Sequence, residues 1–370
     1  MTGSETVVPE APLPRRRVIR IGFVPLCDAA PVVMAHELGL FAARDLRVEL
    51  SREVGWATIR DKIVLRELDA AHAPAAMVLG ISLGIGSFKL PCATGLVLNL
   101  NGNGITLSNR LWQAGVRDAA MLRDLIRSRR NRGPLTFGVA FSCSSHNFLL
   151  QKWLRDVGLN PQQDVNIVVV PPPQMAANLK AGNLDGYCVG EPWNSLAVVQ
   201  RAGWVAALSP EIDPGHPEKV LLVRGDFAET RAEEHERLIS ALLEACEFCQ
   251  PFSNREQIVE TLSRPEYLNI NPEALQSSLC GPFKFRRSEA KPVPELHLFA
   301  GPGLNEPGLD KAAWARQSLR ETGLLPNSAQ LDRERLAAMF RSDVFHSAKP
   351  RVGVDDTNCP QMEQTGRPME

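Results

Sequence analysis

Long apolar runs are missing from this chain of 370 residues. No segment reaches the roughly 18 uninterrupted apolar residues of a membrane-spanning helix. The opening stretch MTGSETVVPEAPLPRRR is polar and proline-rich, and its basic residues follow the apolar ones instead of preceding them. A secretory signal has the opposite order and a continuous apolar centre. We therefore expect a cytoplasmic protein with no membrane contact.

An excess of charge of either sign is missing as well. The formal net charge is −1, and the chain has 44% apolar and 22% charged residues, which is ordinary for a soluble globular protein. The basic runs at 15–17 and 127–132 are short and lack interleaved aromatic residues, so we interpret them as solvated surface. The composition predicts no direct binding of nucleic acid.

Paired cysteine motifs are almost missing. The eight cysteines are scattered, mostly inside apolar runs, which is typical of reduced buried thiols and not of a disulfide framework. Only Cys246 and Cys249 form a C-x-x-C, and they lie inside the helical pattern LISALLEACEFCQ with no second ligand pair nearby. We interpret this pair as packing, and we expect neither a metal site nor a cofactor.

The sequence does have a regular alternation of short β-like runs with longer helical ones from residue 17 onward, which predicts parallel βαβ units. A chain of this length is too long for one minimal core, so an α/β protein of two lobes is expected. The first series has the strand candidates RIGFVPL, RVELSREV, LVLNL and GITLS. The second has LTFGVAF, NIVVV, GYCV and KVLLV, and helix-rich sequence follows it.

Three strand-to-helix loops of the second series should lie together at the carboxyl edge of one sheet, where open α/β folds bind ligands. They read SCSSHN, PPPQM and GEPWN. Each loop opens a helix, so free backbone N–H groups and the positive ends of the helix dipoles point to the same crevice. This arrangement favours an anionic ligand.

The loop SCSSHN offers two kinds of donor. Ser144 or Ser145 can cap the helix that follows, and His146 can either donate a hydrogen bond into the cleft or satisfy its own loop. A catalytic dyad of Cys143 and His146 would need a third, orienting group, and none is evident. We expect no catalytic residues.

The loop GEPWN begins with Gly190, which allows close approach of another backbone, and its Pro192 suits the first turn of a helix. We expect Glu191 to line the cleft. Trp193 can line the cleft or pack between the lobes, and we prefer packing.

The first lobe supplies a facing set. Trp56, in VGWATIRDK, lies at a strand-to-helix junction where its indole N–H can meet an anion or pack in a core. Lys219, in HPEKV, precedes the return strand and would place an ammonium at the junction of the lobes, although an exposed lysine is the alternative.

The block PPPQMAANLKAGNLDGYCVGEPWN, with GWATIRDKI upstream, SSHN between and HPEKV downstream, resembles the nitrate/bicarbonate branch of ABC-transporter substrate-binding proteins. The resemblance extends from residue 17 to about residue 346. It implies a type II periplasmic-binding-protein fold, in which two α/β lobes joined by a two-segment hinge close over a ligand. The chain would cross between the lobes at GITLS and at KVLLV.

We expect the domain bounds to follow this resemblance. The first lobe would comprise 17–107 and 219–346, and the second lobe 108–218. The polar segments 1–16 and 347–370 are expected to be disordered tails.

The resemblance also implies the ligand, nitrate or nitrite, and the residues that hold it. Asn103 stands where the transporter receptors carry a glutamine, and the bicarbonate relatives carry a glutamate in place of Lys219. Nitrate has only acceptor oxygens and one negative charge, so it needs donors and a cation, whereas bicarbonate brings an O–H that a carboxylate accepts. The implied ligand-binding residues are Trp56, Asn103, His146, Pro172, Gly190 and Lys219.

Without an export signal, the chain resembles the NasS-type cytoplasmic nitrate/nitrite sensors. This implies that the ligand-free form sequesters a NasT-like antiterminator, an RNA-binding protein with an ANTAR domain, and releases it when the anion binds.

The first alternative is the substrate-binding component of a nitrate, nitrite or bicarbonate ABC transporter. The second is an enzyme similar to thiamine-precursor synthases, which would need a cysteine-rich run near a histidine, whereas the cysteines here are spread out. We expect a binding protein and not an enzyme.

Overall fold

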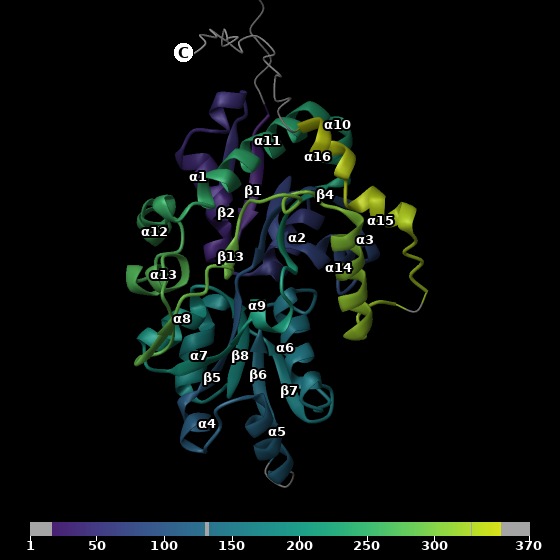
Figure 1. The fold of residues 1–370 in the computed structure, drawn as a ribbon. Helices are drawn as coiled ribbons and strands as arrows, with labels where there is room; N and C mark the ends of the chain where they lie inside the picture. Colours follow the sequence, from purple (N-terminus) through teal and green to yellow (C-terminus); the bar gives the residue numbers. More distant parts are fainter. Residues whose placement is uncertain (1–16, 130–132, 327, 349–370) are drawn as a thin grey trace, which may run out of the picture.

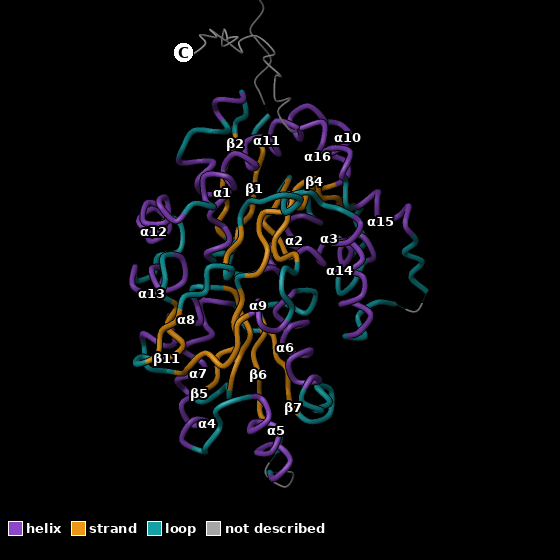
Figure 2. The backbone as a smooth tube through the Cα atoms, viewed as in Figure 1, coloured by secondary structure: helices purple, strands orange, loops and turns teal. Residues whose placement is uncertain are grey.

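The computed structural model describes residues 17–129, 133–326 and 328–348 (Figure 1). These residues form two α/β lobes, each built on one sheet, with helices around the strands (Figure 2). The segment 1–16, expected as a tail, lies outside the described residues, as does 349–370. The second expected tail starts too early, because the helix α16 (Ser342–Ala348) continues through residues 347 and 348.

The sheet of the first lobe has the strand order β13-β4-β10-β3-β1-β2. The first three strands of the chain run parallel, and β10 lies antiparallel to both β3 and β4. Strands β3 and β10 are buried along their whole length, as expected for the interior of a sheet that is covered on both faces. The bounds are β1 (Ile19–Phe23), β2 (Val48–Arg52), β3 (Ala70–Pro74), β4 (Cys92–Asn101), β10 (Pro217–Arg224) and β13 (His297–Leu298).

The sheet of the second lobe has the order β7-β6-β8-β5-β9. Strand β6 pairs in parallel with β7 and β8, whereas β5 runs antiparallel to β8 and β9. The predicted parallel sheet is therefore mixed. The bounds are β5 (Asn103–Ser108), β6 (Leu135–Val139), β7 (Val165–Val169), β8 (Gly186–Gly190) and β9 (Gly203–Leu208).

Helices follow most strands, as the alternating pattern predicts. Those of the first lobe are η1 (Cys27–Ala29), α1 (Ala30–Glu37), η2 (Ala42–Arg44), α2 (Trp56–Val64) and α3 (Ala75–Leu83). Those of the second are α4 (Asn109–Gln113), α5 (Ala119–Ser128), α6 (Ser145–Asp156), η3 (Pro172–Gln174), α7 (Met175–Ala181), α8 (Trp193–Val199) and α9 (Ser209–Ile212).

The chain first crosses between the lobes at Gly102. Strand β4 ends at Asn101 in one sheet, and β5 begins at Asn103 in the other. Asn101 has φ 62° and Gly102 has φ 102°, so the direction of the chain changes through the left-handed region that glycine tolerates best. The prediction that GITLS belongs to the first lobe, with a boundary after 107, is wrong because this strand pairs with β8 and β9.

The chain returns to the first lobe at the start of β10, two residues before the predicted boundary at 219, and the segment that follows packs on both lobes. Helix α13 contacts α8, and Phe283 and Leu296 share an apolar cluster with Val198, Val205 and Leu208 of the second lobe. Helices α12 and α13 lie on one side of the molecule, and α14 and α15 on the other (Figure 1). The elements are α10 (Gly225–Thr230), α11 (Ala232–Cys249), η4 (Phe252–Asn254), α12 (Arg255–Ser263), α13 (Pro272–Leu279), β11 (Phe283–Arg286), β12 (Glu289–Lys291), α14 (Leu309–Glu321) and α15 (Arg333–Met339).

The cysteines of the described residues are free thiols. Cys246 and Cys249 are fully buried in α11, where the Cys246 thiol lies 3.5 Å from the carbonyl oxygen of Leu98. No set of three or more histidine, cysteine or acidic side chains in the described part of the chain is arranged to hold a metal ion. None of the helices described there combines the length and the apolar character needed to cross a membrane.

Candidate anion-binding site

Two adjacent side chains, Glu218 and Lys219, meet at the junction of the lobes. Neighbouring residues of a regular strand face opposite sides of a sheet. Here the register of β10 against β4 shifts between Pro217 and Lys219 and again before Val220, so the start of β10 is bulged. The Lys219 ammonium contacts a carboxylate oxygen of Glu218, and both side chains are fully buried.

Lys219 has a second acidic partner. Its Nζ lies 2.8 Å from Oδ2 of Asp28 in η1, and Oδ1 of Asp28 lies 2.8 Å from Nε2 of His72 in β3. Burial alone would raise the pKa of Asp28, but Lys219 and then His72 outweigh it and lower that pKa to about 2. Burial likewise opposes the charge on Lys219, yet Asp28 and Glu218 raise its pKa. The ammonium is therefore charged, and it already pairs with two carboxylates.

The Glu218 carboxylate lies among the donors expected for an anionic ligand. Asn103 Nδ2 donates to it at 2.6 Å, His216 Nε2 lies 3.1 Å from it, and His146 Nε2 lies 3.6 Å from it. Burial works against ionisation, but Lys219 and the hydrogen bond from His216 hold the pKa of Glu218 well below its ordinary value. The protein thus places a carboxylate of its own at the centre of the group.

Three further side chains of this region have buried polar groups that make no hydrogen bond with the described residues. These groups are the indole N–H of Trp56, both ring nitrogens of His146 and the hydroxyl of Ser145. The Trp56 and His146 rings are 5.2 Å apart, and Lys219 Nζ lies 5.0 Å from the Trp56 ring. Burial, and then Lys219, lower the pKa of His146 to about 3, so its neutral ring offers one N–H. Buried polar groups without partners are rare because each costs about 1–3 kcal/mol.

Gly190 completes the second-lobe side of the group at the end of β8. A Cβ atom there would lie 2.9 Å from Leu26 Cδ2, 3.4 Å from Asn103 Oδ1 and 3.6 Å from His146 Nε2. The absence of a side chain lets the two lobes approach each other at this position.

The structure brings five of the predicted residues together: Trp56, Asn103, His146, Gly190 and Lys219. Ser145 lies next to them at the start of α6. Pro172 is buried at the start of η3, and the contacts that define the group do not include it, so its role stays a prediction.

Four residues of the group are absent from the predicted set: Asp28, His72, His216 and Glu218. Two of them lie in HPEKV, which the resemblance already singles out. Regular strand alternation would have turned Glu218 away from Lys219, and only the bulge brings them to one place.

The loop GEPWN holds the lobes together. The Cys27 N–H donates to the Glu191 carbonyl oxygen at 2.7 Å, and Trp193 Nε1 donates to the Pro25 carbonyl oxygen at 2.9 Å. The Glu191 carboxylate accepts from the Ser278 hydroxyl at 2.5 Å, and burial raises its pKa. Glu191 and Trp193 thus form an interlobe contact that connects the second lobe to η1 and to α13.

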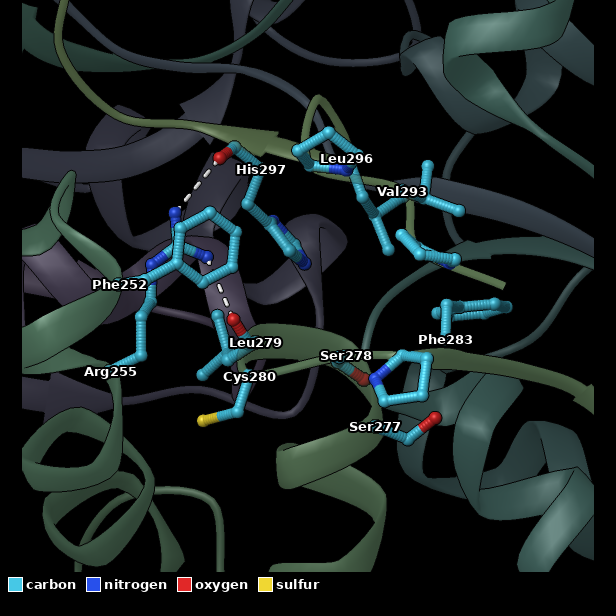
Figure 3. A pocket seen from close by; sticks show the side chains of 14 residues that line it. Phe252, Arg255, Ser277, Ser278, Leu279, Cys280, Phe283, Val293, Leu296 and His297 are labelled. Carbon is cyan, nitrogen blue, oxygen red and sulfur yellow. Dashed lines mark hydrogen bonds between the residues drawn. The ribbon is translucent and has the colours of Figure 1, made fainter. Parts of the chain in front are cut away.

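A separate pocket of about 390 Å³ lies beside this contact (Figure 3). The His297 ring points into it, and Arg255 donates to the carbonyl oxygens of Leu279 and His297. None of the residues predicted to hold the anion lines it. Its lining comprises Phe252, Arg255, residues 277–283, residues 292–294, Leu296 and His297.

Cys143 does not form the dyad considered from the sequence. Its sulfur faces Gly80 of α3, where an added Cβ would lie 3.3 Å away. Burial raises the pKa of this thiol to about 11, which removes the thiolate that a nucleophile needs.

Comparison with solved structures identifies the fold. The crystal structure of the periplasmic nitrate-binding protein NrtA from Synechocystis PCC 6803 superposes with a TM-score of 0.83 at 28% identity, covering 90% of this chain and 88% of that one. The alkanesulfonate-binding protein SsuA from Xanthomonas axonopodis shares the fold with a TM-score of 0.62 at 14% identity. The predicted type II periplasmic-binding-protein fold is confirmed.

Relatives found by sequence comparison are named for the transport or binding of nitrate, nitrite or bicarbonate. The bicarbonate transport ATP-binding protein CmpC of Synechococcus elongatus is 38% identical over 340 residues, which are 91% of this chain and 50% of that protein. The nitrate import ATP-binding protein NrtC of Synechocystis sp. is 38% identical over 339 residues, with the same coverage. The nitrate/nitrite binding protein NrtA of Nostoc sp. is 28% identical over 356 residues, with 94% and 80% covered.

The chain spans about half the length of CmpC and NrtC. It has no G-x-x-x-x-G-K-[ST] pattern, the loop with which many ATPases bind phosphate, so its similarity to these proteins lies outside that motif. The model of the NMT1-like family matches residues 13–263, which is more than half of the chain. This protein therefore belongs to the NMT1-like family.

Proposed function

We propose that this protein binds a small monovalent oxyanion, nitrate or nitrite with bicarbonate as the competing ligand, between its two lobes, and that it acts as a substrate-binding component of an ABC transporter. The observation that carries the proposal is the set of buried donors without partners, Trp56, Ser145 and His146, beside the charged Lys219. A ligand with several acceptor oxygens would satisfy all three. The proposal includes no catalysis.

The chemistry of the group supports an anion over a neutral or cationic ligand. Trp56 offers only a donor, the neutral His146 offers one, and Asn103 Nδ2 already donates to a carboxylate. The protein places its own carboxylate, Glu218, at the centre of the group, which supports a site that stabilises a planar group of oxygens carrying negative charge. Relatives named for nitrate, nitrite and bicarbonate support the same class.

Titration calorimetry in chloride-free buffer tests this function. Nitrate or nitrite should give a saturable isotherm without added metal. Sulfate, which carries two charges, should give only heats of dilution and serves as the control anion. Heats indistinguishable from dilution for nitrate, nitrite and bicarbonate alike would contradict the proposal.

A NasS-type sensor in the cytoplasm, which sequesters a NasT-like antiterminator, is the second candidate. The interlobe contact favours it, because Glu191 and Ser278 link ligand closure to α13, part of a segment that packs on both lobes. Closure around the anion would therefore change the outer surface that a partner reads. A pull-down of the antiterminator with and without millimolar nitrate separates the candidates: a sensor releases its partner on nitrate, whereas a transport component never forms the complex.

A further inference from the structure

His216 is hydrogen-bonded in a way that requires an additional proton. Its Nδ1 lies 2.8 Å from the carbonyl oxygen of Asp213, and its Nε2 lies 3.1 Å from Oε2 of Glu218. A carbonyl oxygen only accepts, so Nδ1 carries a hydrogen. A neutral imidazole has no second N–H, and its bare Nε2 would then face a carboxylate oxygen. Asn103 Nδ2 also lies 3.4 Å from Nε2, but it already donates at 2.6 Å to the same Glu218 oxygen. The 3.1 Å contact between Nε2 and Glu218 is itself attractive only when one more proton is present, either on Nε2 or on Glu218.

The charges around Glu218 show why that proton matters for an anion. When the pair lacks its proton, Asp28 and Glu218 carry two negative charges and Lys219 carries one positive charge, so the ionised side chains sum to one negative charge. A bound monovalent anion would raise the net charge of this region to two negative charges. No side chain of the region is exposed, so this charge is strongly unfavourable without compensation. The proton of the His216–Glu218 pair supplies that compensation.

The other titratable groups that face Glu218 do not supply it. Burial lowers the pKa of His72, of His146 and of His297, the last two to about 3, so these rings are neutral. Burial raises the pKa of the Cys188 thiol, which stays protonated. The full set, by element, is Asp28 (η1), His72 (β3), His146 (α6), Cys188 (β8), His216 (before β10), Lys219 (β10) and His297 (β13).

We propose that the oxyanion binds together with one proton, which the His216–Glu218 pair holds; this inference rests on the anion-binding function proposed above. The anion accepts hydrogen bonds from donors that now face Glu218, namely Asn103, His146 and Lys219. The proton comes from solvent and stays on the pair, so no other group changes its charge. His216 and Glu218 are then residues that determine which anions bind.

The position of His216 gives the proton a route. Its ring stacks on Trp314 of α14 at 5.7 Å between centroids, and both residues line a pocket of about 570 Å³. His216 therefore connects this pocket with the Glu218 carboxylate. Asp213, whose carbonyl oxygen accepts from His216, also accepts from Trp314 Nε1 through its carboxylate at 2.8 Å, which fixes the ring between them.

The inference predicts a difference between two anions of equal charge. Nitrate carries no hydrogen and needs the proton from solvent, so its binding should weaken about tenfold for each pH unit over the range in which the proton is taken up. Bicarbonate carries an O–H that can donate to the Glu218 carboxylate. Its binding should be independent of pH over the range in which it stays bicarbonate.

The test is titration calorimetry of the wild-type protein with nitrate between pH 6 and pH 9, in pairs of chloride-free buffers that differ in their enthalpy of ionisation. The expected result is an uptake of about one proton per nitrate wherever Kd rises about tenfold per pH unit. Glu218→Gln removes the charge and keeps the shape, so it should bind nitrate at pH 8 at least about tenfold more tightly than wild type, without proton uptake. Glu218→Asp keeps the charge and should keep the pH dependence, and the exposed Glu49→Gln is the control.

Nitrate binding to the wild type with no proton uptake and a constant Kd from pH 6 to pH 9 would overturn this inference alone and leave the anion-binding function intact. A Glu218→Gln variant that keeps the wild-type pH dependence would also overturn it. Absence of binding by nitrate, nitrite and bicarbonate would overturn both proposals. If Glu218→Gln does not fold, the proton count of the wild type decides by itself.

Discussion

The two lobes contribute side chains of different charge to their junction, and each contribution is called a wall. The first lobe contributes the ionised groups Asp28, Glu218 and Lys219, which contact one another and are fully buried. The second lobe contributes neutral donors, among them Asn103 and His146. The first wall is therefore a buried network of paired charges that stabilises the fold, and the second wall supplies neutral donors, of which His146 has no hydrogen-bond partner in the described part of the chain.

The largest expected effect comes from breaking the charged wall. Lys219→Met leaves the carboxylates of Asp28 and Glu218 buried without a cation, so the free energy of unfolding at pH 7 should fall by roughly 3–5 kcal/mol, and anion binding should disappear. Urea denaturation measures the first effect. Lys152→Met is the matched control, because Lys152 and Asp156 are both exposed in their 2.9 Å pair, and it should cost less than about 1 kcal/mol. Equal losses in the two variants would contradict the account.

The charged wall should also make the free energy of unfolding depend on pH. The folded pKa of Asp28, about 2, lies below its unfolded value of about 3.9, so Asp28 stabilises the fold above pH 4 and loses this contribution as pH falls towards 2. The contribution amounts to about 2 kcal/mol. Asp28→Asn should therefore lose less unfolding free energy than wild type as pH falls from 4 towards 2. The exposed Asp310→Asn should lose as much as wild type over this range, and the same loss in Asp28→Asn would contradict the role of Asp28.

A smaller effect is expected from the neutral donors, which include Trp56 of the first lobe, and it should fall on binding. Trp56→Phe removes an indole N–H that has no partner in the described part of the chain, so Kd for nitrate should rise about tenfold, the value of one hydrogen bond to a charged acceptor. Trp204→Phe is a close control: its buried indole N–H also lacks a partner there, but it lies in β9, away from the group. The same Kd in both variants would remove Trp56 from the site.

The smallest effect is expected at the interlobe contact. Trp193→Phe removes the 2.9 Å hydrogen bond to Pro25 and keeps an aromatic ring between the lobes. Because one such bond contributes about 1 kcal/mol to closure, affinity for the anion should fall about fivefold. Small-angle scattering of the ligand-free variant should show a larger radius of gyration than wild type, and an unchanged radius with unchanged affinity would show that this contact does not control closure.

The sequence predicts most of the longer strands but misses β3 and β9, as well as the short strands β11, β12 and β13. Strand β3 reads AAHAP, and alanine is depleted in strands, so the usual β-branched signal is missing. It nevertheless lies in the middle of the first sheet, between β10 and β1, where tertiary packing outweighs local preference. GITLS is recognisable as a strand, yet its lobe is fixed by pairing with β8 and β9, which no local pattern contains.

The site residues likewise divide into those that local sequence patterns indicate and those that only tertiary pairing brings together. Trp56, His146 and Gly190 lie where strands meet helices or end, and the general rule for α/β folds places such positions at the ligand edge. Glu218 follows no such rule, because its direction depends on a bulge that forms only when β10 pairs with β4. Asp28 lies in a 3-10 helix, and only the folded structure shows that it pairs with Lys219.

A crystal structure of the protein with bound nitrate tests the central claim most directly, namely that the buried donors at the lobe junction hold a small oxyanion. The account predicts nitrate within hydrogen-bonding distance of Trp56 Nε1 and His146, with the Glu218 carboxylate moved away from Asn103. Nitrate bound only in the pocket lined by Arg255 and His297, with Glu218 still hydrogen-bonded to Asn103, would contradict it.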